Sequence, residues 1–178
     1  MINFQKYVKA TSLEEAYTLN QQKNNRVLGG MLWMRLGTNN YNTVIDLTDL
    51  GLNKIEENDS EFKIGAMVTL RDFETNEGLE KFSNGAIKDA VKDIIGVQFR
   101  NLATVGGSIW GRFGFPDILT VLLAFDSYVE LYKGGIVPLD EFSKMPYDRD
   151  ILVSIIIKKK SCKCVYDAVR IQRTDFPV

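Results

Sequence analysis

The first fifty residues alternate short apolar runs with a helical pattern, and this alternation restricts the fold more than any other feature of the chain. The apolar runs, each of strand length, are residues 4–8, 26–28 and 43–47. Ser12 and Glu15 have the spacing of a capping box and predict a helix after the first run. A short helical segment is expected at residues 31–36. Strands that alternate with helices predict a small parallel sheet with right-handed crossovers.

From residue 52 onward the pattern changes to hairpins and separate helices. Strands are expected at residues 52–56, 61–66, 128–132, 136–137, 151–157 and 164–171. Helices are expected after a cap formed by Thr69 and Asp72, over residues 86–95, and from Pro116 onward, whereas residues 96–115 show no simple periodicity. The predicted fold class is therefore α+β, with a β-α-β unit at residues 1–51 and a larger, mainly antiparallel unit at residues 52–178.

The charge and apolar composition of the chain limit the classes of partner that it is expected to bind. The chain of 178 residues carries 22 Lys and Arg against 23 Asp and Glu, which gives a net charge of −1. Nucleic acid is not expected as the main partner, because phosphate backbones bind clustered cations. The lysines at residues 158–160 are expected to lie in a solvated turn. No apolar run reaches the length of a membrane span and no targeting signal is visible, so we expect a soluble, cytoplasmic protein without a membrane partner.

The chain contains no histidine. This excludes Ser-His-Asp and Cys-His catalysis, HExxH-type zinc sites and histidine as an attachment point for a covalent cofactor. The two cysteines, Cys162 and Cys164, are too few to hold an iron–sulfur cluster, and alternate positions of a strand face opposite ways. We therefore expect no metal site, and any redox chemistry must come from a bound organic cofactor.

Two glycine pairs, Gly29-Gly30 and Gly106-Gly107, stand where a strand or loop leads into a helix. Glycine lets backbone N–H groups approach an anion closely, and a helix N-terminus adds partial positive charge. Two such loops that converge would hold a pyrophosphate without any Lys or Arg, although each pair alone is also explained as a tight turn. Neither pair belongs to a GxGxxG fingerprint or a P-loop, which leaves a nicotinamide-type site without support.

Three further side chains accompany these loops. Trp33 and Trp110 each stand three residues after a glycine pair, where they either pack against a ligand or close the interface between the two units. Asp117 stands in the first turn of the helix expected after Pro116. It either stabilises that helix through the macrodipole or accepts hydrogen bonds from sugar or ribityl hydroxyls.

Five features follow one another in a specific order: VLGG at residues 27–30, VIDL at 44–47, IGAMVTL at 64–70, QFRNLATVGGS at 98–108, and Asp117. Together they resemble the FAD-binding medium subunit or domain of molybdenum hydroxylases, the family of xanthine dehydrogenase and carbon monoxide dehydrogenase. The resemblance covers essentially the whole chain, and the QFRNLATVGGS block is its most specific part.

The resemblance implies a two-subdomain FAD fold of the vanillyl-alcohol oxidase/MurB-like (PCMH) type, with non-covalent FAD between the subdomains and its pyrophosphate on both glycine loops. Matching positions imply these FAD contacts: Val27, Leu28, Gly29, Gly30, Met31, Leu32, Trp33, Ile94, Thr104, Val105, Gly106, Gly107, Ser108, Asp117, Leu152 and Arg170. The implied partners are a large subunit that binds molybdopterin and a small subunit with [2Fe–2S] clusters, from which electrons pass through FAD to NAD or another acceptor.

The chain departs from the family pattern at several positions. Met31 replaces the usual Thr or Ser, Arg170 replaces a Lys, and residues 110–115 differ from the usual Ala/Ser/Pro-rich stretch. The chain ends at Val178, so the C-terminal domain of the family is expected to be absent. No catalytic acid or base is evident. Two alternatives stay open: a scaffold that kept the fold without FAD, and a stand-alone flavin reductase or oxidase of the same fold.

Overall fold

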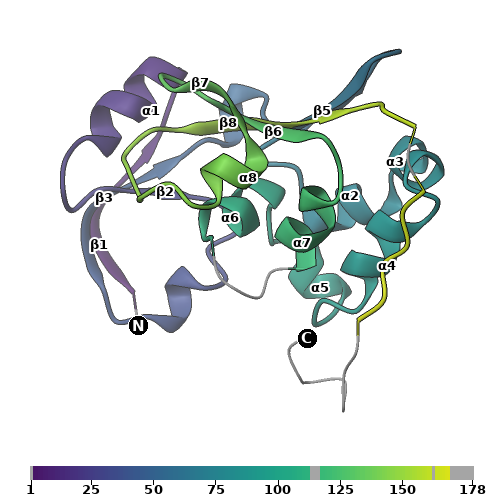
Figure 1. Ribbon diagram of the computed structural model, residues 1–178. Coiled ribbons are helices and arrows are strands. Elements are labelled where there is room, and N and C mark those ends of the chain that lie inside the picture. Colours follow the sequence, from purple (N-terminus) through teal and green to yellow (C-terminus); the bar gives the residue numbers. More distant parts are fainter. Residues whose placement is uncertain (1, 113–116, 162, 169–178) are drawn as a thin grey trace.

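The computed structural model describes residues 2–112, 117–161 and 163–168, and these residues form two β-sheets with associated helices (Figure 1). The smaller sheet contains β1 (Asn3–Lys9), β3 (Asn40–Asp46) and β2 (Arg26–Leu28), in that order, with all strands parallel. Helix α1 (Leu13–Asn20) connects β1 to β2. The 3-10 helices η1 (Met34–Leu36) and η2 (Thr48–Leu50) flank β3. The predicted parallel sheet is confirmed, but only the last three residues of the segment expected at 31–36 are helical.

The larger sheet is antiparallel and has five strands in the order β4-β5-β8-β6-β7. Their bounds are β4 (Ile55–Glu57), β5 (Glu61–Gly65), β6 (Ser127–Leu131), β7 (Gly135–Pro138) and β8 (Leu152–Lys158). In the β4–β5 turn, the Asn58 side chain accepts hydrogen bonds from the backbone N–H groups of Ser60 and Glu61. Both predicted hairpins are confirmed, and β8 is the central strand because it pairs with β5 and β6.

Within the described residues, seven short helices accompany the larger sheet, and most of them lie along one of its faces (Figure 1). They are α2 (Leu70–Thr75), α3 (Glu77–Phe82), α4 (Ala86–Lys92), α5 (Val97–Arg100), α6 (Val105–Trp110), α7 (Asp117–Leu123) and α8 (Leu139–Phe142). The predicted cap of α2 is confirmed, since the Thr69 hydroxyl accepts from the Asp72 N–H. In the described part of the chain, no helix combines the length and the apolar composition needed to cross a membrane.

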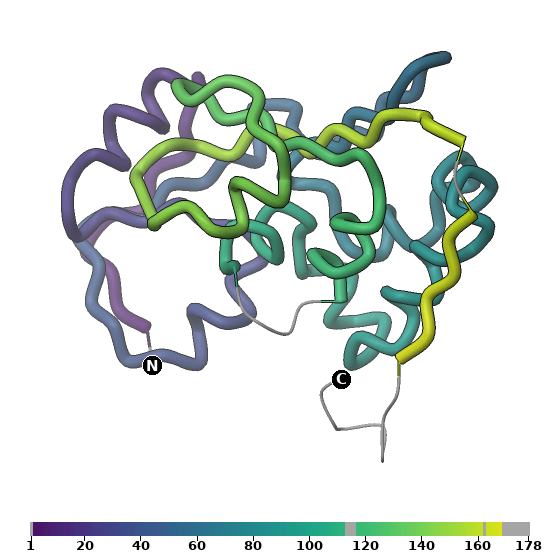
Figure 2. The backbone as a smooth tube through the Cα atoms, in the orientation of Figure 1, coloured from purple at the N-terminus to yellow at the C-terminus, as the bar shows by residue number. Residues whose placement is uncertain are grey.

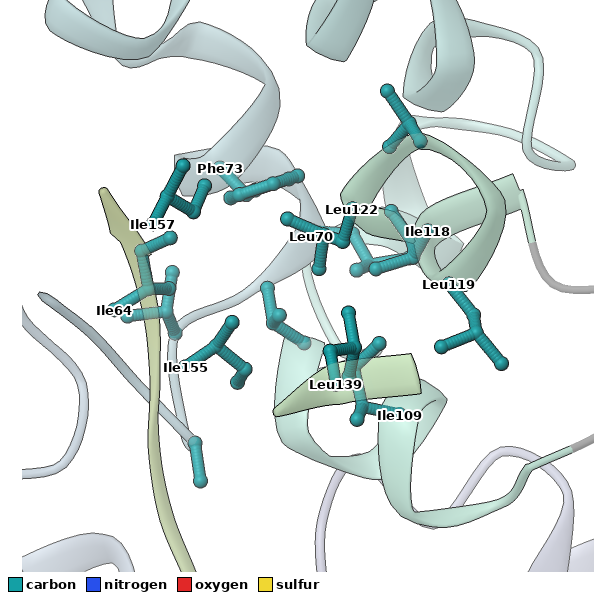
Figure 3. Packing of buried hydrophobic residues seen from close by; sticks show 14 of the residues in the cluster. Ile64, Leu70, Phe73, Ile109, Ile118, Leu119, Leu122, Leu139, Ile155 and Ile157 are labelled. Atoms are coloured by element: carbon teal, nitrogen blue, oxygen red, sulfur yellow. The ribbon is translucent and has the colours of Figure 1, made fainter. Parts of the chain in front are cut away.

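The main hydrophobic core lies between these helices and the larger sheet (Figure 3). Ile64 and Ile155 of the sheet face Phe73 of α2 and Leu122 of α7, and all four side chains are fully buried. Each such side chain contributes about 1.5–3 kcal/mol through the removal of apolar surface from water. This packing holds α2, α6 and α7, and with them the second glycine pair, against the sheet.

A second cluster joins the two sheets. Ala16 of α1 and Ile45 of β3 pack with Ile151, which directly precedes β8. Beside it, the Arg149 guanidinium donates hydrogen bonds of 2.6–2.8 Å to the carbonyl oxygens of residues 20, 22 and 23, at the C-terminal end of α1. A cation is favoured there by the helix macrodipole. The parallel sheet is therefore packed firmly against the rest of the chain, and the division into units at residues 51 and 52 stays a prediction.

The N-terminal cap of α1 differs in one hydrogen bond from the predicted capping box. The Ser12 hydroxyl accepts from the Glu15 N–H as expected. The Glu15 carboxylate, however, accepts from the backbone N–H and the hydroxyl of Thr11 rather than from Ser12. The backbone hydrogen bond from Thr11 lowers the pKa of Glu15. The cap therefore extends one residue further toward β1 than its spacing indicated.

The helix predicted at residues 86–95 ends earlier, at Lys92. Its inner face is buried as predicted up to Val91, but Ile95 has a φ of 52° and a side chain that is 77% exposed. The Ile94 carbonyl oxygen accepts a hydrogen bond from the Arg100 guanidinium instead of from a helical N–H. The helix therefore ends before its apolar periodicity does, where the Ile94 N–H bonds to the Val91 carbonyl oxygen and Ile95 adopts the left-handed conformation.

Three other predictions need correction. Residues 96–115 contain α5 and α6, which are too short to show periodicity. Residues 163–168 form no strand, and the tail instead passes beside the helices (Figure 2). The lysines at residues 158–160 do not form a solvated turn, because Lys158 is the last residue of β8 and the Lys159 side chain is only 21% exposed. Pro116, Cys162 and residues 169–171 lie outside the described residues.

Candidate functional site

The two glycine pairs, separated by more than seventy residues in the sequence, meet in space. A β-carbon placed on Gly29 would lie 2.8 Å from the Thr104 hydroxyl oxygen and 3.6 Å from the Gly107 Cα. A β-carbon on Gly30 would lie only 1.9 Å from the Leu102 carbonyl oxygen. Glycine is therefore needed in the first pair because the second loop packs directly against its backbone. The predicted convergence of the two loops is present in the structure.

The second glycine pair opens α6, and its two residues have different surroundings. A β-carbon on Gly106 would lie 2.6 Å from the Ala66 carbonyl oxygen, whereas one on Gly107 would meet only the Thr104 hydroxyl, at 2.9 Å. Gly106 is buried and Gly107 is exposed. Gly106 therefore serves the packing of α6, and Gly107 leaves open space above the helix N-terminus.

Most backbone donors at this helix N-terminus are already in use. The N–H groups of Val105 and Gly106 donate to the carbonyl oxygens of Val68 and Ala66, each at 2.9 Å. The Gly107 N–H donates to the N-cap hydroxyl of Thr104 at 3.1 Å. The second loop therefore offers a ligand fewer donors than the sequence pattern indicated. The Gly107 N–H and the Ser108 hydroxyl both donate to Thr104, and each can serve a ligand only by exchanging Thr104 for the ligand as acceptor.

The first loop offers more donors. The N–H groups of Gly29, Gly30, Met31 and Leu32 donate no hydrogen bond to any described residue. Met31 has a φ of 60°, in the left-handed region that side chains other than glycine rarely adopt. Consecutive N–H groups around such a residue form the concave arrangements that bind anions. The first loop is therefore the better placed of the two to bind a phosphate.

A cleft of about 310 Å³ adjoins these loops. It is lined by Leu32, Arg35, Ile95, Gly96, Gln98, Phe99 and Leu102. Leu32 belongs to the first loop, and Leu102 precedes the second, so the cleft continues directly from the glycine contact. Its walls combine apolar side chains with the guanidinium of Arg35, a composition that suits a flat, partly apolar, anionic ligand.

The remaining predicted contacts lie at different depths. Asp117 begins α7 and is 9% exposed, and its carboxylate accepts a hydrogen bond of 2.5 Å from the Tyr166 hydroxyl. Ile94 is half-buried against the core, and Leu152 is buried within it. Arg170 lies outside the described residues. The structure thus brings the two loops together and gives Asp117 a protein partner that the sequence did not indicate.

The two tryptophans have different environments. Trp33 is 52% exposed at the first loop. Trp110 packs against the core, with its ring 5.9 Å from that of Phe142 in α8. The Arg112 guanidinium lies over the same Phe142 ring at 4.0 Å. Trp33 is therefore the better placed of the two to contact a ligand, and Trp110 helps to hold α6 against α8.

One buried ion pair next to the site was not singled out from the sequence. Glu74 of α2 and Arg100 of α5 have side chains that are 7% and 6% exposed and lie 2.8 Å apart. The only signal for this pair was that Arg100 belongs to the QFRNLATVGGS block. Its partner is 26 residues away in the sequence, and no local pattern connects the two.

Comparisons with known proteins agree with this geometry. Residues 2–159 match the family model described as the FAD binding domain in molybdopterin dehydrogenase. The chain is 30% identical over 120 residues to the Escherichia coli protein YgfM, which covers 67% of this chain and 44% of YgfM. It is 29% identical over 155 residues to the glyceraldehyde dehydrogenase medium chain of Sulfolobus acidocaldarius, which covers 81% of this chain and 54% of the relative. The chain thus spans about half the length of these curated relatives.

Two solved structures share the fold. A chain of carbon monoxide dehydrogenase from Hydrogenophaga pseudoflava matches with a TM-score of 0.82 and 21% identity, over 97% of this chain and 66% of that one. A chain of quinoline 2-oxidoreductase from Pseudomonas putida 86 matches with a TM-score of 0.83 and 17% identity, over 98% of this chain and 65% of that one. From its match to the family model over most of its length, the chain belongs to the FAD-binding domains of the molybdopterin dehydrogenase family.

Proposed function

We propose that this chain binds FAD non-covalently and acts as the electron-transferring flavin subunit of a molybdenum hydroxylase. The observation that carries the proposal is the contact between the two glycine loops, where the N–H groups of residues 29–32 have no acceptor among the described residues. Bound FAD would supply the redox chemistry. The chain itself binds and orients the cofactor, and the absence of histidine is consistent with non-covalent attachment.

The residues present fit an FAD pyrophosphate. Its negative charge requires several donors. The Gly29 and Gly30 amides donate to no described residue, and the Gly107 amide and the Ser108 hydroxyl at the same loop contact would join them by exchanging Thr104 for a phosphate oxygen as acceptor. The open side of Gly107 allows a close approach that a side chain would block. The Arg35 guanidinium at the adjoining cleft adds a cation. The site thus supplies phosphate contacts mainly from backbone atoms.

The other family positions are assigned roles on the same basis. An ionised carboxylate has about four lone-pair positions, so Asp117 can accept from Tyr166 and from a ribityl or ribose hydroxyl together. Trp33 and Ile94, which are the chain neighbours of the cleft-lining Leu32 and Ile95, are assigned contacts with the cofactor, and we also assign Leu152 and Arg170 to the cofactor site. In this proposal residues 1–51 and 52–178 are the two FAD subdomains.

Electron transfer and partners belong to the same proposal. The medium chain of glyceraldehyde dehydrogenase and the carbon monoxide dehydrogenase chain are parts of oxidoreductases by their names, which supports a subunit role. We propose a molybdopterin-binding large subunit and a small subunit with [2Fe–2S] clusters as partners, with NAD or another acceptor receiving the electrons. Co-expression with such subunits and recovery of one complex by affinity purification tests this part, and a chain recovered alone would contradict it.

FAD titration of the purified chain tests the central claim. Flavin fluorescence should saturate at about one FAD per chain, and acid precipitation should release the flavin intact. Gly107→Asp should abolish binding, because it places a carboxylate where the pyrophosphate lies. Gly135→Asp is the matched control: a β-carbon there meets nothing within 4 Å in the β6–β7 hairpin, and the φ of 69°, which Asp tolerates better than most residues, should cost stability but not FAD affinity. A chain that takes up no FAD would support the flavin-free scaffold instead.

A further inference from the structure

Arg100 makes the most extensive buried polar contacts near the cleft. Its Nε donates to Glu74 Oε2 at 2.8 Å, and Arg71 contributes a second cation to the same carboxylate, at 3.0 Å. Arg100 is 5% exposed and Glu74 is 6% exposed, whereas the Arg71 side chain is 39% exposed. Burial of a charge is costly unless it is paired, so the geometry of the Glu74–Arg100 pair is tightly constrained.

The same guanidinium also reaches the segment between α4 and α5. Its Nη1 donates to the Ile94 carbonyl oxygen at 3.0 Å. Ile95, the next residue, has a left-handed backbone and a side chain that is 77% exposed. Burial of apolar surface therefore does little to hold Ile95 in place. Polar contacts hold the backbone here instead: the Ile94 N–H donates to Val91, the Arg100 N–H donates to the Gly96 carbonyl oxygen, and the Arg100 guanidinium supplies the side-chain contact, to the Ile94 carbonyl oxygen.

This segment is one wall of the cleft. Ile95 and Gly96 line it together with Leu32 of the first loop and Arg35 of η1. We propose that Arg100 is a positioning residue for the FAD site: paired with Glu74, it holds the Ile94–Gly96 wall at the distance from the first loop that the cofactor requires. This inference rests on the proposed FAD function. Arginine suits the task because its planar fork serves a carboxylate and a carbonyl at once, which a single ammonium does less well.

The test uses the double variant Arg100→Met/Glu74→Gln, which removes the contact to Ile94 without leaving a buried charge unpaired. The matched control is Arg71→Met, which removes the exposed cation from the same carboxylate and leaves the Ile94 carbonyl bonded. FAD affinity is measured by fluorescence titration, amide hydrogen exchange of residues 94–97 by mass spectrometry, and stability by urea unfolding.

We expect the double variant to bind FAD at least about tenfold more weakly, the equivalent of one lost hydrogen bond to a charged group, and to exchange faster at residues 94–97. The control should bind FAD like the wild type. Unchanged affinity with a lowered urea midpoint would overturn the inference, because Arg100 would then have only a structural role.

If the double variant does not fold, Arg100→Lys, which keeps the charge beside Glu74, takes its place. It should weaken FAD binding and speed exchange at residues 94–97, and wild-type values for both would overturn the inference. A wild-type chain that binds no FAD would instead refute the proposed function, which keeps the two failures distinguishable.

Discussion

Alanine substitutions at Gly106 and Gly107 should separate two reasons for glycine at neighbouring positions. A β-carbon at Gly106 would lie 2.6 Å from both the Cβ and the carbonyl oxygen of Ala66. Ordinary carbon contacts lie at about 3.5–4.0 Å, so α6 and the backbone at Ala66 would have to move apart by about 1 Å. That movement also disturbs the 2.9 Å hydrogen bonds that the Val105 and Gly106 N–H groups donate to this segment.

The expected loss of stability follows from this displacement. Overpacking of a filled core costs about 1–3 kcal/mol, so Gly106→Ala should lose about 2 kcal/mol in the free energy of unfolding. At Gly107 the added methyl meets only the Thr104 hydroxyl. Movement of that hydroxyl weakens the N-cap bond to the Gly107 N–H, at a cost of about 1 kcal/mol, and the gain of up to about 1 kcal/mol in helix propensity offsets it. Gly107→Ala should therefore unfold within about 1 kcal/mol of the wild type.

Urea unfolding and FAD titration on the same preparations provide the assay. With a urea m-value of about 2 kcal/mol/M, the midpoint of Gly106→Ala should fall by about 1 M. Gly107→Ala should keep its midpoint but bind FAD more weakly, because the methyl group covers the open face beside the Gly107 amide. The reasoning would be refuted by a Gly106→Ala variant as stable as the wild type, or by a Gly107→Ala variant that binds FAD normally.

Three other predictions follow. Asp117→Asn should weaken FAD binding by about 1.5–3 kcal/mol in calorimetry, while a loss of stability alone would indicate a purely structural contact to Tyr166. In Trp110→Phe, saturating FAD should quench the remaining emission of Trp33, and emission indifferent to FAD would place the first loop outside the site. Burial alone raises the pKa of Asp46, but hydrogen bonds from Thr48 and Tyr7 outweigh it and lower that pKa. The Asp46 carboxylate therefore binds a proton more readily in the unfolded chain than in the folded one, and the stability that it contributes is lost as pH falls below about 4. Asp46→Asn should therefore flatten the decline of the urea midpoint between about pH 5 and 3. A decline as steep as that of the wild type would contradict the assignment.

The elements that the sequence predicted well are those with local causes. The strand at residues 26–28 has the bounds that its apolar run indicated, and the cap at Thr69 forms as its spacing required. The hairpin turn at Asn58 also depends on neighbouring residues alone. The cap and the turn need no information from distant parts of the chain, because their side chain and backbone partners lie at most three residues apart. The strand pairs with residues 44–46, but its bounds were already marked by its own apolar run.

The failures share a different cause. The apolar periodicity of the helix predicted at residues 86–95 continues beyond Lys92, but the chain leaves the helix there: Ile95 is left-handed, and the Ile94 carbonyl oxygen is bonded to the buried Arg100 guanidinium. The position of Asp117 predicted either a carboxylate that stabilises the start of a helix or a contact to a ligand. In the structure the Asp117 carboxylate accepts a hydrogen bond from Tyr166, which is 49 residues away in the sequence. Periodicity within a window cannot report a contact that only tertiary packing creates.

By itself, the sequence determined the class of fold, the family and the approximate position of the site, because these depend on strand and helix alternation and on two short glycine motifs. Only the tertiary structure decided what each glycine does. Gly30 and Gly106 are required by backbone packing against Leu102 and Ala66, whereas Gly107 faces open space. It also showed that the α6 amides are mostly bonded to the segment at residues 66–68, so that the first loop supplies the available donors. The physical reason is that a hydrogen bond or a steric contact depends on two partners, and the second partner here lies far away in the chain.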